Sequence, residues 1–281
     1  MPMLASSLVS RPAGSRGGRL VRIAFAIGAA AMLTGCANRM FQVEMSGEAP
    51  PEGTPISVVV RGEHANVLLT TDHRVEAPTL KARADGARRG AVHMPADLGY
   101  VRADLTHDGE SGYTLEIEID RAPQRDLAAG PSTVTLRTPA IGDVRVRNHG
   151  GYVHVSGASG AIDIQNGVGG EGGNVRVRTD APIDRDVRME TTDGQVTLSI
   201  PQDAKGTLEV SAPRGKPTID ARTVALEAFR PMPAERVWLA VLNGGENRIY
   251  LRTGRGNARI NIVTEPMRTS FFQPFIETAP D

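Results

Sequence analysis

The chain has 281 residues, and its 32 Lys and Arg residues balance 32 Asp and Glu residues. Hydrophobic residues make up 40% of the chain and charged residues 23%, which is ordinary for a packed globular protein and excludes wholesale disorder. The zero net charge gives no indication of a nucleic-acid-binding protein. A single cysteine excludes an intramolecular disulfide and a Cys-based zinc cluster.

The first 35 residues have the layout of a secretory signal. Residues 1–22 contain four arginines and no acid, and an apolar run follows from Ile23 to Leu33. This run is too short to cross a bilayer, which takes about 20 apolar residues. A basic segment, a short apolar segment and then small residues predict a cleaved export signal peptide at residues 1–35.

The apolar run ends in Leu33-Thr34-Gly35-Cys36, and Cys36 is the only cysteine of the chain. These residues resemble the lipobox of bacterial lipoproteins, in which the cysteine thiol receives a diacylglyceryl group and the signal is cleaved just before it. The resemblance implies a lipoprotein that begins at Cys36 and carries palmitate-type acyl chains. Ala37 implies sorting to the outer membrane. The alternative is a lone buried cysteine that follows an ordinary signal.

Cleavage at this site changes the charge of the chain. It removes four arginines and no acid, which leaves 28 bases, 32 acids and a formal charge of −4. Because a mildly acidic chain is not attracted to anionic lipid, membrane attachment is expected to rest on the acyl chains. Residues 36–55 are rich in Gly and Pro near their end and are predicted to be the lipid-anchored tether.

From residue 56 the dominant pattern is an alternation of apolar and polar residues, which predicts β-strands. Residues 56–129 form an irregular N-terminal β region, with a hairpin turn expected at Asp108-Gly109. Its strand candidates are Ile56–Val60, Asn66–Thr70, Val101–Leu105 and Tyr113–Ile119. The best helix candidate of the whole chain is Val224–Phe229, which Pro231 and Pro233 cut short.

Residues 130–264 carry the alternation as a regular series of short units such as Val153-His-Val155 and Val196-Thr-Leu198. Each unit has two apolar residues around one polar residue, and Gly or Asn residues stand between the units, where they are expected to supply the positive φ of tight bends. Short strands of this kind bury a continuous apolar column only when they stack. Residues 265–281 are predicted to be a C-terminal tail or cap.

The series predicts an all-β fold, a β-solenoid or β-helix-like stack of short strands, with a β-sandwich as the alternative. In this register Val196 and Leu198 face inward and Thr197 faces outward. The same reasoning places Trp238 and Tyr250 on the outside of their strands.

The series of short units also resembles the putative adhesin family of bacterial envelope β-solenoids. The segments that carry the resemblance are Gly160–Ile164, Asp193–Pro201 and Leu251–Ile260. The family's repeat is a small residue, Gly, a polar residue and then two hydrophobic residues that flank a third position. The resemblance implies a β-solenoid over about half of the chain, and it brings no catalytic residues with it.

Candidate chemistry is sparse. No metal, nucleotide or nucleophile-elbow motif is present, so no catalytic, cofactor-binding or metal-binding residue is assigned. The six histidines, His154 among them, are expected to be exposed. Two groups of charged residues are candidate glycan sites, but we interpret both as solvated surface. The first is a set of turn carboxylates, Asp143, Asp163, Asp180, Asp184, Asp186 and Asp193, and the second is a basic stripe of Arg145, Arg147, Arg176, Arg178 and Arg188.

Together these features predict a lipid-anchored cell-envelope protein, held in the outer membrane through acyl chains on Cys36. Its body is expected to be a non-catalytic module for binding, adhesion or scaffolding, with an envelope glycan or a protein as partner and no nucleic acid. The alternatives are a glycan-cleaving β-helix enzyme, for which Asp184 and Asp186 are the candidates, and an envelope sensor that binds a protein partner.

Overall fold

The computed structural model describes residues 40–84, 101–109, 112–120, 132–167, 170–222 and 224–268. Cys36, the expected signal peptide and most of the expected C-terminal tail lie outside these residues. The described part of the chain is all-β, and its regular elements are strands without any helix. Accordingly, the same residues include no helix long and apolar enough to cross a membrane.

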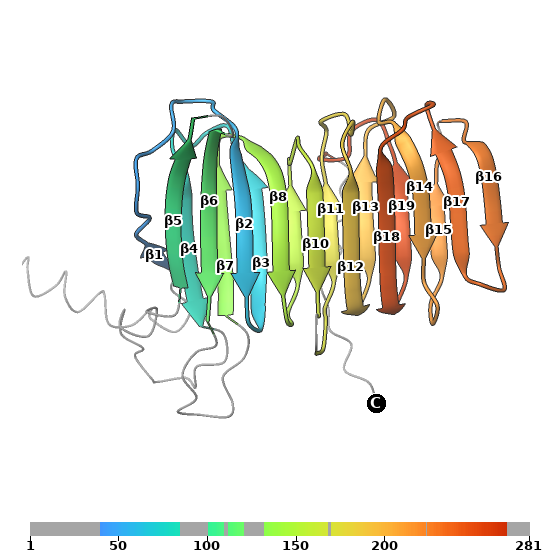
Figure 1. The fold of residues 1–281 in the computed structure, drawn as a ribbon, viewed down its shortest axis with the longest axis horizontal. Coiled ribbons are helices and arrows are strands. Elements are labelled where there is room, and N and C mark those ends of the chain that lie inside the picture. The colour runs from blue at the N-terminus through green and yellow to red at the C-terminus, as the bar shows by residue number, and fades with distance from the viewer. Residues whose placement is uncertain are drawn as a thin grey trace, which may run out of the picture. The chain divides into compact units, whose positions relative to one another are not determined.

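In the described residues the strands form two sheets, each with parallel and antiparallel pairs (Figure 1). Sheet A runs in the spatial order β1 (Phe41–Val43), β4 (Thr79–Ala84), β7 (Ser132–Thr138), β3 (Ala65–Thr71), β9 (Val153–Ser156), β11 (Val175–Arg178), β13 (Val196–Ile200), β19 (Ala258–Ile262) and β15 (Pro217–Asp220). Sheet B runs in the order β16 (Glu227–Met232), β17 (Val237–Leu242), β14 (Gly206–Ser211), β18 (Arg248–Arg255), β12 (Val187–Asp193), β10 (Ile162–Asn166), β8 (Ile141–Asn148), β2 (Ile56–Gly62), β6 (Gly112–Ile119) and β5 (Val101–Asp108).

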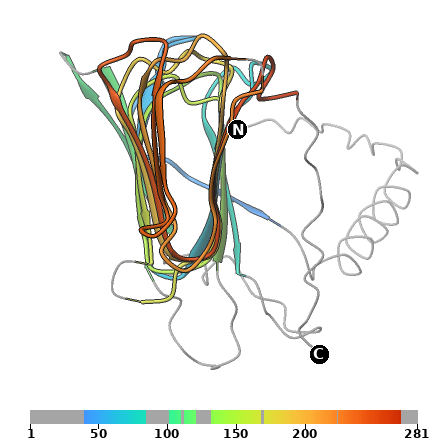
Figure 2. The same cartoon turned by 90° about the vertical axis from the view of Figure 1, so that its right-hand side faces the viewer.

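From β8 to β13 the chain alternates between the sheets, and each strand pairs in parallel with the strand two places further on. The register is unshifted, so Val144, Ile162 and Val187 are neighbours across sheet B. Val153 and Val175 are aligned in the same way in sheet A. Figure 2 shows the two sheets as layers that face each other.

The spatial order of the strands departs from the chain order at both ends of this central stack. β18 and β19 follow β14 and β15 in the chain, yet they lie between those strands and the pair β12 and β13. At the other end, β2 and β3 pair in parallel with β8 and β9. Residues 56–71 therefore continue the same parallel ladders, although their sequence looked irregular.

Antiparallel pairs occur at the two ends of the stack. The predicted hairpin at Asp108-Gly109 is confirmed, because β5 and β6 pair antiparallel with Asp108 opposite Gly112. The helix candidate Val224–Phe229 is wrong, since the chain enters strand β16 at Glu227 and pairs antiparallel with β17. Two prolines follow closely, and an edge strand tolerates the proline that a helix does not.

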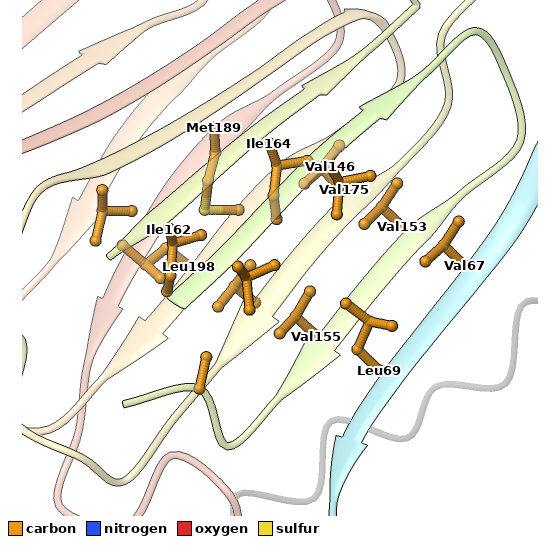
Figure 3. Packing of buried hydrophobic residues seen from close by; sticks show 14 of the residues in the cluster. Val67, Leu69, Val146, Val153, Val155, Ile162, Ile164, Val175, Met189 and Leu198 are labelled. Atoms are coloured by element: carbon orange, nitrogen blue, oxygen red, sulfur yellow. The ribbon is translucent and has the colours of Figure 1, made fainter. Parts of the chain in front are cut away.

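The hydrophobic core lies between the sheets and follows the predicted two-residue period. In β13, Val196, Leu198 and Ile200 are fully buried, whereas Thr197 and Ser199 are only partly buried. Figure 3 shows side chains from both sheets, such as Ile164 and Leu198, packed together in this core.

The predicted register is wrong by one residue in β17. Trp238 lies opposite Val210, a fully buried residue of β14, and packs against the core rather than facing outward. A one-residue shift moves every side chain of a strand to the other face, and here pairing with β14 fixes the register. Tyr250 does face outward, as predicted, and the guanidinium carbon of Arg248 lies 4.8 Å from its ring centroid.

The corner residues act in two ways, only one of which was expected. Glycines do supply positive φ: Gly256 has a φ of 135°, and a Cβ there would meet the carbonyl oxygen of Gly194. The asparagines mostly do not, because among the described residues Asn243 alone of them has a positive φ. The fully buried Asn148 instead donates from Nδ2 to the Ala65 carbonyl at 2.9 Å and to Asn166 Oδ1 at 3.0 Å. Buried corner amides thus connect β8 with β3 and β10.

Candidate functional site

The predicted anchor and the folded body are close in sequence. Cys36 itself lies outside the described residues, but β1 begins only five residues later, at Phe41. β1 lies within the stretch expected to be a tether, and it pairs antiparallel with β4, with Phe41 opposite Ala82.

The outer face of sheet B is covered by opposite charges in neighbouring positions. Arg147 forms an ion pair with Asp163 on the next strand. Arg248 approaches Glu209 at 2.7 Å, and on β12 Arg188 Nε donates to Glu190 Oε1 at 2.9 Å. Ion pairs of this kind, between neighbouring strands or along one strand, support the sheet and leave its face close to neutral.

The five arginines of the candidate basic stripe do not share a face. Arg145, Arg147 and Arg188 belong to β8 and β12 of sheet B, whereas Arg176 and Arg178 belong to β11 of sheet A. A single stripe is therefore wrong, because consecutive strands of the central stack alternate between the two sheets.

The outer face of sheet A brings a histidine and two arginines together. His154 on β9 is the direct neighbour of Arg176 on β11, and Ser156 is the neighbour of Arg178. Arg178 Nε donates to Ser156 Oγ at 3.0 Å. This grouping was not visible in the sequence, where the residues lie on separate units and no periodic signal shows which units become neighbours.

Burial and nearby cations disfavour a further positive charge at this place. Burial, followed by the charges of Arg178 and Arg176, lowers the pKa of His154 from 6.5 to about 4. Burial first and Arg176 second also lower the pKa of Arg178, against a smaller opposing effect of Asp180. The expectation that His154 is exposed holds only in part, since its side chain is half-buried on the outer face of sheet A.

The turn carboxylates mostly hold the backbone and the arginines in place. Asp143 Oδ1 accepts from the Ala161 amide and Asp186 Oδ1 from the Arg248 amide, each at 2.8 Å. Asp163 and Asp193 form ion pairs with Arg147 and Arg255, and Asp180 Oδ1 accepts from the Met267 amide at 2.8 Å. The described residues contain no group of three or more His, Cys, Asp or Glu side chains able to hold a metal ion.

An open hollow of about 460 Å³ lies where the chain leaves β19. Its described lining is Val263, Thr264, Glu265 and Arg268. Arg268 and Glu265 form an ion pair across 3.2 Å. The two charged side chains of this lining therefore satisfy each other, and the hollow adds no acid–base pair to those already described.

Comparison with known proteins gives matches only among solved structures. No family model matches the chain, and no curated protein does. A putative cell adhesion protein from Clostridium sporogenes is 11% identical with a TM-score of 0.47, and the match covers 81% of this chain and 98% of that one. A putative adhesin from Bacteroides fragilis is 13% identical with a TM-score of 0.28, over 80% and 98% of the two chains. A putative lipid binding protein from Parabacteroides distasonis is 9% identical with a TM-score of 0.21, over 81% and 96%. Such similarities do not carry function from one protein to another.

Proposed function

We propose that this chain is an exported lipoprotein of the cell envelope, anchored through acyl chains on Cys36, whose body is a non-catalytic binding or adhesion module. The anchor rests on the basic segment, the short apolar run and the Leu33–Cys36 sequence that precede the body. Two or more acyl chains hold a protein stably at a membrane, where a single chain does not. Ala37 favours the outer membrane.

We further propose that the body is a two-sheet β-solenoid rather than a β-sandwich. Support comes from the parallel, unshifted ladders β8–β10–β12 and β9–β11–β13, in which each coil adds one strand to each sheet. A sandwich of the usual kind is built from antiparallel strands. The solenoid core is proposed to extend over the predicted range 130–264, with residues 56–71 stacked onto it.

The observation that supports a binding role is that the charged side chains mostly pair with one another or with backbone amides. The candidate carboxylates on and beside the strands of sheet B accept hydrogen bonds from backbone amides or form ion pairs with arginines, as Asp186 and Asp163 do. A carboxyl group that acts as a general acid or base must lie against a substrate and have a pKa suited to proton transfer. The outer faces of the two sheets offer area for a partner instead.

The proposal is tested in cells of the native host. Membranes are separated by density, and the partners of the gently solubilised protein are identified after cross-linking. We expect the protein in the outer-membrane fraction with an envelope glycan or protein attached, and we expect Cys36→Ser to release the body from that fraction. A body found in the cytoplasm, or turnover of a glycan by the purified protein, contradicts the proposal.

A further inference from the structure

The two sheets differ in the charge of their strands, which the neutral composition conceals. Among the described strands of sheet B, acids and bases occur in similar numbers and form ion pairs. The strands of sheet A contain one acid, Asp220 on the edge strand β15, and it pairs with Arg222 at 3.1 Å. One base of this sheet, Arg137, also has an acidic partner, Asp72 just after β3, at 3.8 Å. The basic residues of the sheet A strands are Lys81, Arg83, Arg137, His154, Arg176, Arg178 and Arg259.

These bases point away from the core. The positions between them in the same strands, such as Leu80 and Val177, are fully buried, so the bases lie on the outer face of sheet A. Lys81 and Arg259 are exposed. The strand ladders hold the lysine and the arginines at fixed positions. Burial and then the charges of Arg178 and Arg176 lower the pKa of His154 to about 4, so at physiological pH the positive charge of the face comes from the lysine and the arginines. The face therefore attracts anions.

The beginning of the body lies at the edge of the same sheet. β1 is the outermost strand of sheet A, and its Gln42 is the neighbour of Lys81 on β4. Four residues lie between Cys36 and Phe41, and the five Cα–Cα steps reach at most about 18 Å. An anchor at Cys36 would thus keep this edge of sheet A close to the bilayer, where charges act over a Debye length of about 8 Å at physiological salt.

We infer that the outer face of sheet A lies against the anionic phospholipid headgroups of the membrane that holds the anchor. The inference rests on the proposed lipid anchor. It assigns opposite roles to the two faces, because the membrane takes the basic face and the ion-paired face of sheet B remains available to a partner. It also changes the expectation from net charge, since an overall charge of −4 hides a face that anionic lipid attracts.

Binding to vesicles tests this orientation. The mature chain carrying Cys36→Ser is sedimented with vesicles of phosphatidylcholine alone and with vesicles that also contain phosphatidylglycerol. We expect binding to the anionic vesicles only, and release in high salt. Each basic residue near an anionic surface strengthens binding about fivefold, which corresponds to about 1 kcal/mol. The double variant Lys81→Glu and Arg259→Glu should therefore bind at least about 25-fold more weakly.

The matched control changes the net charge by the same amount on the other face. Arg145→Glu and Arg252→Glu alter two exposed residues of sheet B, and this pair should leave vesicle binding unchanged. Thermal melts confirm that both variants are folded. Equal losses in the two variants, or no difference between neutral and anionic vesicles, overturn the inference. Binding of the sheet A face to an anionic polysaccharide but not to vesicles also overturns it. The mass of the native N-terminal peptide reports on the anchor separately, so the two failures are distinguishable.

Discussion

A charge placed in the core at Leu198 should unfold the protein, whereas the same charge one residue earlier should be tolerated. Leu198 is fully buried between the sheets. Leu198→Asp loses about 1.5–3 kcal/mol of apolar burial and adds several kcal/mol for a carboxylate in an apolar environment. The sum is comparable with the whole stability of an ordinary domain, about 5–15 kcal/mol.

Thr197 is the control, because its side chain faces the outside of sheet A. Its neighbours across the sheet are Arg176 on β11 and Arg259 on β19. Thr197→Asp therefore places a carboxylate between two guanidinium groups, and we expect a change within about 1 kcal/mol. Thermal and denaturant unfolding of both variants measures the difference. Similar losses in the two variants would refute the register and the stacked core.

Three further predictions concern the corner amides, the half-buried His154 and the absence of turnover. Asn148→Ala should cost about 1–3 kcal/mol in denaturant unfolding, because it leaves the buried Ala65 carbonyl without its amide donor. Asn257→Ala should cost less, because it removes only the acceptor of the exposed Lys216 amide. The pKa of His154 is lowered to about 4, so the unfolded chain binds the extra proton first as the pH falls from about 6.5 to about 4. Stability should drop across that window in the wild type and less in His154→Asn, and identical melting profiles against pH would contradict this. The purified protein should not hydrolyse glycans, peptides or esters, and turnover that Asp184→Ala or Asp186→Ala abolishes would establish the enzyme alternative.

Local patterns allowed part of the fold to be predicted from the sequence. Alternation marked strands such as Val196–Ile200 and placed Leu198 in the core, because side-chain direction in a strand depends only on the position along it. The β5–β6 hairpin followed from a local turn signal at Asp108-Gly109. The same local reasoning failed at Trp238, where the antiparallel neighbour β14 decides which face the strand buries.

The candidate surface depended on information that the sequence does not carry locally. The insertion of β18 and β19 between strands that come earlier in the chain is a choice among distant pairings with similar patterns. The basic face of sheet A appears only when each unit is assigned to its sheet, because His154 and Arg176 lie on separate turns of the chain. Their partial burial also comes from packing. The evidence for the predicted anchor at Cys36, by contrast, lies entirely in the sequence.

The mass of the N-terminal peptide of the native protein tests the account most directly. We expect this peptide to begin at Cys36 and to carry thioether-linked acyl chains. We also expect the protein to stay with membranes in high salt, because salt does not screen acyl-chain burial. In the Cys36→Ser variant the body should fold but remain an uncleaved precursor or become soluble. An unmodified Cys36, or an N-terminus at another bond in the native host, would contradict the anchor, the envelope location and the orientation that rests on them.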